Sequence, residues 1–277
     1  MWLLLACASE PVTLILPDPT RDGADGTDGP WGVARFDRVY PTRVSEAVET
    51  IVLAPYLIGS DGSETFPTVV FDHGGFVDPE RYVWMAQHIA TRGYVVALPR
   101  FPLLLAITAP GNSAAALDGV LADEVGAVEP AAVGGHSLGG VTGSMAWMDD
   151  PRFEGLFILA SFPAEGTAVE GRAGGSVISL IGDQDGSADV AGAEAGLQRF
   201  QDPRLYGLIA GLTHYGWTDD PSEADLAKEQ VPSRPVEDAR RDAMRIYDPW
   251  LDATLRDDPD AQALLDAGVF PNVTVSR

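Results

Sequence analysis

Short apolar, β-branched runs alternate with amphipathic helical segments along most of this 277-residue chain. Strands that are joined through helices pair in parallel, because a parallel connection needs a crossover of a dozen or more residues. The strands expected from this alternation are 68–71, 94–98, 130–134, 156–161, 176–181 and 206–210. The expected helices are 81–91, 114–125, 138–148, 188–200 and 236–255. The pattern predicts a mostly parallel, doubly wound α/β sheet in one domain, preceded by antiparallel strands at 32–40 and 50–58.

The first 30 residues differ in composition from the rest of the chain. Residues 8–30 are rich in Pro, Gly and Asp, which predicts a flexible spacer in front of a single domain spanning residues 31–277. Cys7, the only cysteine, follows Leu4-Leu5-Ala6, a pattern that resembles a bacterial lipobox. We therefore expect an exported protein, either secreted or lipid-anchored through Cys7. The alternative is a merely apolar N-terminus on a cytoplasmic protein.

Acidic residues outnumber basic residues by a wide margin. The chain carries 41 Asp and Glu against 18 Lys and Arg, which gives a formal net charge of −23. This balance argues against nucleic-acid binding, because neutralising phosphates requires clustered Lys and Arg, and it argues against docking on anionic lipid. A single cysteine also excludes an internal disulfide and a cysteine-based zinc site. We expect a monomer.

The segment Gly135-His136-Ser137-Leu138-Gly139 matches the pattern G-x-S-x-G of a nucleophile elbow. It lies where an apolar strand ends and a helix begins, the setting in which a sharp turn lifts a serine hydroxyl clear of the sheet. The start of the helix also directs backbone N–H groups toward a developing oxyanion. Ser137 is therefore the predicted nucleophile and the Leu138 N–H one oxyanion donor. The alternative is a glycine-rich turn in a protein without enzymatic activity.

A serine nucleophile needs a base, and the chain offers four histidines. His136 is a poor candidate, because adjacent side chains in the elbow point apart. His214 follows the last expected parallel strand, at the carboxyl edge where ligands collect in open α/β sheets, and it is the predicted base. The orienting acid of this arrangement lies between serine and histidine in the chain. Asp185 is preferred for this role over Asp183, which lies closer to a strand end, and over Glu165.

A second glycine-rich turn follows the strand expected at 68–71. Its sequence, Asp72-His73-Gly74-Gly75-Phe76, resembles the H-G-G-type turn that supplies an oxyanion N–H in lipases and esterases. We assign this donor to the Phe76 N–H, with the Gly75 N–H as the alternative. The walls of the substrate pocket are expected from side chains beside the catalytic turns, namely Phe76, His136, Phe162 and Tyr215.

The chain resembles the α/β-hydrolase superfamily from about residue 31 to residue 255. The segments that carry the resemblance are Gly134 to Gly140, His73 to Phe76, Gly182 to Asp185 and Gly211 to His214. The resemblance is greatest to capless bacterial serine esterases of the dienelactone-hydrolase-like, platelet-activating-factor acetylhydrolase-like and cutinase-like polyester-hydrolase groups. The short spacings between Ser137, Asp185 and His214 leave no room for a cap domain. Dienelactone hydrolases proper use a cysteine nucleophile, whereas this chain has a serine.

The resemblance implies a serine carboxylic-ester hydrolase that works through an acyl-enzyme on short-chain or polymeric esters. Such an enzyme requires no metal and no organic cofactor. Two alternatives stay open, an acyltransferase or perhydrolase that uses the same triad and a catalytically silent surface lipoprotein.

Overall fold

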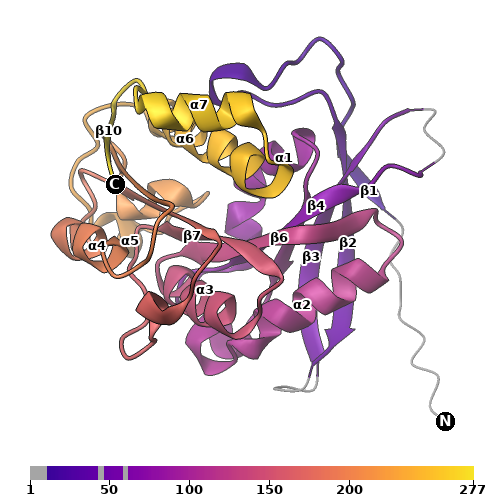
Figure 1. Cartoon of the computed structure of the whole chain (residues 1–277), viewed down its shortest axis with the longest axis horizontal. Coiled ribbons are helices and arrows are strands. Elements are labelled where there is room, and N and C mark those ends of the chain that lie inside the picture. The colour runs from indigo at the N-terminus through magenta and orange to yellow at the C-terminus, as the bar shows by residue number, and fades with distance from the viewer. Residues whose placement is uncertain (1–10, 43–46, 59–61) are drawn as a thin grey trace.

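The computed structural model of this chain describes residues 11–42, 47–58 and 62–277, and these residues form a single ten-stranded sheet (Figure 1). The strand order is β1-β2-β3-β5-β4-β6-β7-β8-β9-β10. The strands from β5 through β4 to β9 pair in parallel, and the pairs at the two ends of the sheet are antiparallel. The strands are β1 Val12–Ile15, β2 Gly32–Pro41, β3 Ala47–Tyr56, β4 Phe66–Asp72, β5 Val95–Pro99, β6 Ala127–His136, β7 Phe153–Leu159, β8 Ser176–Gly182, β9 Arg204–Ile209 and β10 Val273–Ser276.

Helices cover both faces of the sheet. The α-helices are α1 Val83–Thr91, α2 Gly111–Ala122, α3 Leu138–Asp149, α4 Val190–Leu197, α5 Glu223–Leu226, α6 Val236–Arg256 and α7 Pro259–Ala267. In Figure 1, α1 and α6 lie on one side of the sheet with α7 packed on α6, and α2 and α3 lie on the other side. None of the helices that the structure describes is both long enough and apolar enough to cross a bilayer.

The central strands are buried on both faces. Val69, Val70 and Phe71 of β4 follow one another along the strand, and none has more than 1% of its surface exposed. Continuous apolar runs of this kind are typical of parallel strands covered by helices on both sides. Each such side chain contributes about 1.5–3 kcal/mol when it leaves water. The apolar face of α6 completes the core, because Tyr247 and Trp250 pack their rings against the ring of Phe157.

The strands and helices expected from the sequence are all present, with ends that differ by a few residues. The single mostly parallel α/β domain is therefore confirmed. Among the strands and α-helices of the described residues, four were not expected. β1, β10 and α5 have four residues each, which is too short for a periodic pattern to stand out, and α7 follows α6 after only two residues. Cys7 lies outside the described residues, so a lipid anchor at Cys7 stays a prediction.

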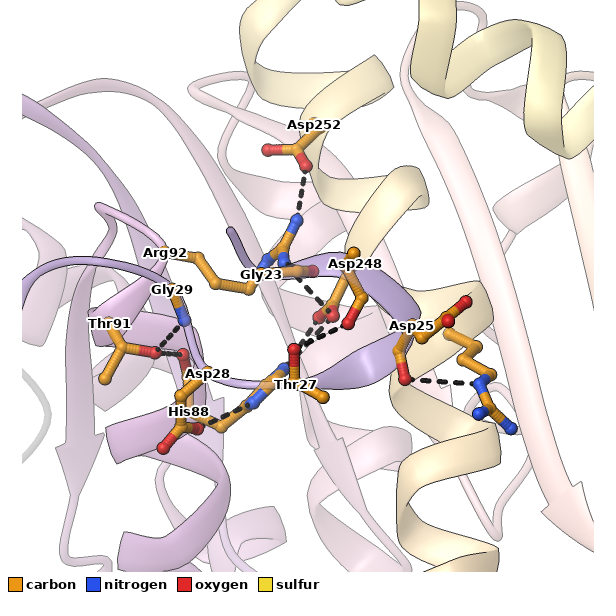
Figure 2. Close-up of polar contacts among 12 residues, drawn as sticks. Gly23, Asp25, Thr27, Asp28, Gly29, His88, Thr91, Arg92, Asp248 and Asp252 are labelled. Carbon is orange, nitrogen blue, oxygen red and sulfur yellow. Dashed lines mark hydrogen bonds and ion pairs between the residues drawn. The ribbon is translucent and has the colours of Figure 1, made fainter. Parts of the chain in front are cut away.

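The expectation of a flexible spacer is wrong for residues 12–29. β1 pairs antiparallel with β2 and extends the sheet, and residues 23–29 lie between α1 and α6 (Figure 2). The Gly29 N–H donates to Thr91 Oγ1 at 2.9 Å, and Arg92 donates to the Gly23 carbonyl. Pro, Gly and Asp do predict irregular backbone here. The backbone is nevertheless held by partners from distant parts of the chain.

His88 of α1 is the centre of this attachment. Its Nδ1 lies 3.2 Å from Asp28 Oδ1 and its Nε2 lies 3.0 Å from Asp248 Oδ1, so the N-terminal segment, α1 and α6 meet at one imidazole (Figure 2). Burial opposes the charged imidazolium, but the attraction and hydrogen bonding of Asp248, aided by Asp28, outweigh it and raise the pKa of His88 to about 9. We call Asp28, His88 and Asp248 the clasp.

Candidate active site

Ser137 lies on a strained turn between β6 and α3. Its backbone has φ 54° and ψ −122°, a conformation that residues other than glycine rarely adopt and that persists only where the surroundings enforce it. Here the turn is enclosed by the backbone of the neighbouring strand end at Asp72. A Cβ added at Gly135 or at Gly139 would lie 1.9 Å from the Asp72 carbonyl oxygen. Only glycine fits at either position, which is the physical reason for both glycines of the G-x-S-x-G pattern.

The backbone of Ser137 is also fixed by hydrogen bonds. Its N–H donates to the Leu159 carbonyl at 2.9 Å, and its carbonyl accepts from Ser161 Oγ at 2.6 Å and from the Gly140 N–H at 2.9 Å. The turn is therefore held from β7 and from the first turn of α3. The side chain that projects from it is half-buried. A hydroxyl presented at this edge of the sheet is accessible to a small molecule while its backbone cannot shift.

Asp185 and His214 form a buried pair at the same edge. Asp185 follows β8 and His214 follows β9, and His214 Nδ1 lies 3.0 Å from Asp185 Oδ2. The exposed fractions are only 6% for Asp185 and 5% for His214. The other carboxylate oxygen, Oδ1, accepts from the Ser187 N–H at 2.8 Å and from the Ala188 N–H at 2.6 Å. The carboxylate is thus oriented by its own loop, and it directs the proton of the imidazole to Nδ1.

The two other acids considered for this role lie elsewhere. Asp183 Oδ1 accepts from the Gly211 N–H at 2.7 Å, so its carboxylate joins the turn after β8 to the turn after β9. Glu165 is exposed in the loop between β7 and β8. The structure therefore brings Asp185, the preferred residue, to the histidine and gives Asp183 a role in shaping the turn.

His136 does not line a substrate pocket, and the expectation that it does is wrong. Its side chain is completely buried, with the ring centroid 4.5 Å from that of His214. Its Nδ1 lies 2.9 Å from the hydroxyl of Tyr82. Burial, followed by the proximity of His214, holds the pKa of His136 well below its usual range. His136 is therefore a neutral ring on which the predicted base packs, and this contact places His214 next to the elbow.

The oxyanion turn differs from the prediction at Phe76. The Phe76 N–H donates to the Leu104 carbonyl at 2.7 Å, so it is not available to a substrate. The Gly74 N–H donates to the hydroxyl of Tyr82 at 3.0 Å. Between them, the Gly75 N–H meets no hydrogen-bond acceptor among the residues that the structure describes. A Cβ added at Gly75 would lie 3.4 Å from Leu138 Cδ2, which places this turn beside the start of α3.

The Leu138 N–H is the other free donor. It belongs to the first residue of α3, where an N–H has no partner within the helix. Within the described part of the chain, no acceptor binds it. Gly75, the alternative considered from the sequence, therefore replaces Phe76 as the candidate second donor. The reason is that the Leu104 carbonyl, in the loop after β5, already accepts the hydrogen bond of the Phe76 N–H.

Large apolar side chains lie on the loops that follow β4, β5 and β7 at this edge of the sheet. Phe76 is 73% exposed, Leu103 is 80% exposed and Phe162 is 43% exposed. Tyr215 is half-buried, with its ring edge-on to His214 at a centroid distance of 5.3 Å. We call Phe76, Leu103 and Phe162 the apolar rim. Leu103 was not among the expected pocket residues, although the apolar run Phe101-Pro102-Leu103-Leu104-Leu105 follows a strand at the carboxyl edge.

The fold and the arrangement of these residues are typical of α/β hydrolytic enzymes. A serine stands on a strained strand-to-helix turn, and a buried Asp–His pair follows later strands at the same edge of a mostly parallel sheet. The model of the alpha/beta hydrolase family matches residues 68–223, more than half of the chain, and the chain belongs to this family. The matched residues include Ser137, Asp185 and His214. No curated protein matches the chain.

Proposed function

We propose that the protein is a serine carboxylic-ester hydrolase. In this proposal Ser137, His214 and Asp185 form the catalytic triad, and the N–H groups of Leu138 and Gly75 form the oxyanion hole. The observation that carries it is the buried 3.0 Å contact between Asp185 Oδ2 and His214 Nδ1, at the sheet edge where Ser137 stands on its strained turn. A carboxylate on Nδ1 leaves Nε2 as the nitrogen that takes a proton.

The reaction proceeds through an acyl-enzyme. His214 Nε2 takes the proton of Ser137 Oγ while this oxygen attacks the ester carbonyl carbon. The carbonyl electron pair moves to oxygen, where the N–H groups of Leu138 and Gly75 donate hydrogen bonds worth roughly 3–4 kcal/mol each in the transition state. The ester C–O bond then breaks, and His214 protonates the leaving alcohol. Water, deprotonated by His214, attacks the acyl-enzyme, releases the carboxylic acid and restores the serine. The cycle needs no metal and no organic cofactor.

The apolar rim supports substrates with an apolar acyl or backbone portion. Three large apolar side chains are exposed on loops at the edge of the sheet that carries the candidate site, and covering them with substrate recovers free energy at about 25 cal/mol per Å². This favours short-chain or polymeric esters. Among the capless serine esterases, the groups similar to platelet-activating-factor acetylhydrolases and to cutinase-like polyester hydrolases fit better than dienelactone hydrolases, because the nucleophile is Ser137 and not a cysteine.

The test combines covalent labelling with a panel of p-nitrophenyl esters of increasing chain length. We expect the wild-type protein to react with a fluorophosphonate probe and to release p-nitrophenol, and we expect Ser137→Ala to do neither while keeping the same melting temperature. A folded wild-type protein that does not label refutes the proposal. Product partition in the presence of an added alcohol separates hydrolysis from acyl transfer, because an acyltransferase delivers the acyl group to the alcohol in preference to water.

A further inference from the structure

A short segment between α5 and α6 lies against both loops that carry the Asp–His pair. We call residues 228–234 the strap, residues 183–188 the acid loop and residues 210–215 the base loop. A Cβ added at Gly186 of the acid loop would lie 2.1 Å from the Lys228 carbonyl oxygen, and one added at Gly211 of the base loop would lie 2.3 Å from Arg234 Cγ. The strap therefore packs on both loops with no space between them.

Glu229 of the strap bonds to both loops through one carboxylate. Its Oε2 accepts from the Gly186 N–H at 3.1 Å and from the His214 N–H at 3.1 Å, and its Oε1 accepts from the Tyr215 N–H at 2.9 Å. Gly186 directly follows Asp185, so a single carboxylate holds the backbone beside the proposed acid and the backbone of the proposed base. Hydrogen bonds to an ionised carboxylate are shorter and roughly twice as strong as those between neutral groups.

We infer that Glu229 is a positioning residue for the esterase reaction: its carboxylate fixes the acid loop against the base loop and so sets the Asp185–His214 geometry. The inference rests on the proposed triad. Proton transfer through an imidazole tolerates little displacement, since an error of about 1 Å at a catalytic group costs up to about 100-fold in rate. Among the residues that the structure describes, Glu229 hydrogen-bonds to backbone N–H groups of these two loops and to neither Ser137 nor the oxyanion donors, so its effect passes through the Asp–His pair.

The test is a double-mutant cycle on the full-length protein. Glu229→Gln keeps the size of the side chain, but it removes the charge, and its amide nitrogen cannot accept from a backbone N–H. Either the Tyr215 N–H or both the Gly186 and the His214 N–H therefore lose their acceptor, and the remaining hydrogen bonds are weaker because they go to a neutral amide. We expect kcat for a p-nitrophenyl ester to fall about 10- to 100-fold while KM changes by less than about twofold. Glu223→Gln, an exposed carboxylate on neighbouring α5, is the matched control, and we expect it to retain the wild-type kcat.

The same substitution in an Asp185→Asn background distinguishes positioning from general stabilisation. Once the Asp185–His214 pair is disabled, Glu229→Gln should lower kcat by less than a further factor of about two, because the effects of residues that act as one unit are not additive. An equal loss of kcat in both backgrounds would mean a merely structural role and would overturn the inference, as would a wild-type kcat in Glu229→Gln alone. Glu229→Asp keeps the charge but is too short to reach both loops, so a wild-type kcat in this variant also counts against the inference.

Failure of the inference and failure of the proposed function give different results. If the wild-type protein hydrolyses esters through Ser137 and Glu229→Gln behaves like the wild type, only the positioning role is lost. If the wild-type protein shows no Ser137-dependent hydrolysis, the triad is lost and the positioning role falls with it.

Discussion

Replacing Asp185 by asparagine should stop proton transfer through His214 without disturbing the fold. The backbone N–H groups of Ser187 and Ala188 both donate to Asp185 Oδ1, at 2.8 and 2.6 Å, while Oδ2 faces His214 Nδ1 at 3.0 Å. Asparagine has one acceptor oxygen, and the two N–H donors hold it at the Oδ1 position. Its NH₂ group then faces Nδ1 and forces the imidazole proton onto Nε2. In that tautomer His214 cannot take the proton of Ser137.

The expected loss in kcat is large. An enforced wrong tautomer lowers kcat about 10⁴-fold in a serine triad, which corresponds to about 5.5 kcal/mol at about 1.4 kcal/mol per tenfold change. The assay is steady-state hydrolysis of a p-nitrophenyl ester, with the melting temperature as a check on folding. Asp183→Asn is the matched control, because an amide oxygen still accepts the single N–H of Gly211, and we expect its kcat within about threefold of the wild type.

Two outcomes would refute this reasoning. One is an Asp185→Asn protein whose kcat stays within about tenfold of the wild type, since the tautomer argument then fails. The other is a larger loss in Asp183→Asn than in Asp185→Asn, which would exchange the roles of the two acids.

Three other substitutions test separate parts of the structure. The pKa of His88 is raised from 6.5 to about 9, so the clasp stabilises the fold fully below pH 6.5 and loses this contribution as the pH rises through about 9. The melting temperature of the wild type should therefore fall between pH 6.5 and about pH 9. The melting temperature of His88→Gln should not show this fall. Tyr82→Phe removes the hydroxyl that holds the Gly74 N–H, next to the proposed oxyanion donor Gly75, and should lower kcat for esters about tenfold. The kcat for thionoesters should hardly change, because their sulfur accepts hydrogen bonds weakly. An unchanged ratio of ester kcat to thionoester kcat would contradict this role of Tyr82. Gly139→Ala places a Cβ 1.9 Å from the Asp72 carbonyl oxygen, so a soluble variant with wild-type activity would contradict the packing of the elbow.

The architecture and the three proposed catalytic residues follow from local patterns. Alternating strands and helices set the parallel sheet, and a glycine-flanked serine between a strand and a helix marks the elbow. His214 and Asp185 follow from their places after later strands, because the carboxyl ends of parallel strands meet at one edge. Each of these inferences uses only residues that are neighbours in the chain, together with one rule of topology.

The details that the sequence left open depend on partners far away in the chain. Whether the Phe76 or the Gly75 N–H is free depends on the Leu104 carbonyl, which comes from a loop where Leu103 and Leu104 both have positive φ. No local pattern predicts such backbone at two leucines. The role of Glu229 depends equally on three N–H donors in two other loops.

The same applies to the N-terminal segment. Its composition predicts irregular backbone and the backbone is irregular, but the segment is held through Asp28 by His88, which is itself bound to Asp248. Composition describes the conformation that a segment adopts. It does not describe whether distant side chains hold that segment in place, and for this reason residues 12–29 belong to the folded domain.

The candidate site consists of two units that different parts of the chain hold together. The elbow and the oxyanion turn form one unit, because Gly135 and Gly139 both pack against the Asp72 carbonyl at backbone contact. The Asp–His pair forms the other, on loops that a carboxylate of the strap joins. Substitutions in the first unit should therefore affect folding and the stabilisation of the oxyanion together, since no side chain can be inserted there without moving the serine. Substitutions in the strap should affect proton transfer while the fold survives. The side chains of the apolar rim are exposed, and only Phe76 belongs to one of the two units, through its backbone in the oxyanion turn. Substitutions of these side chains should therefore change which ester is preferred at little cost to the chemistry.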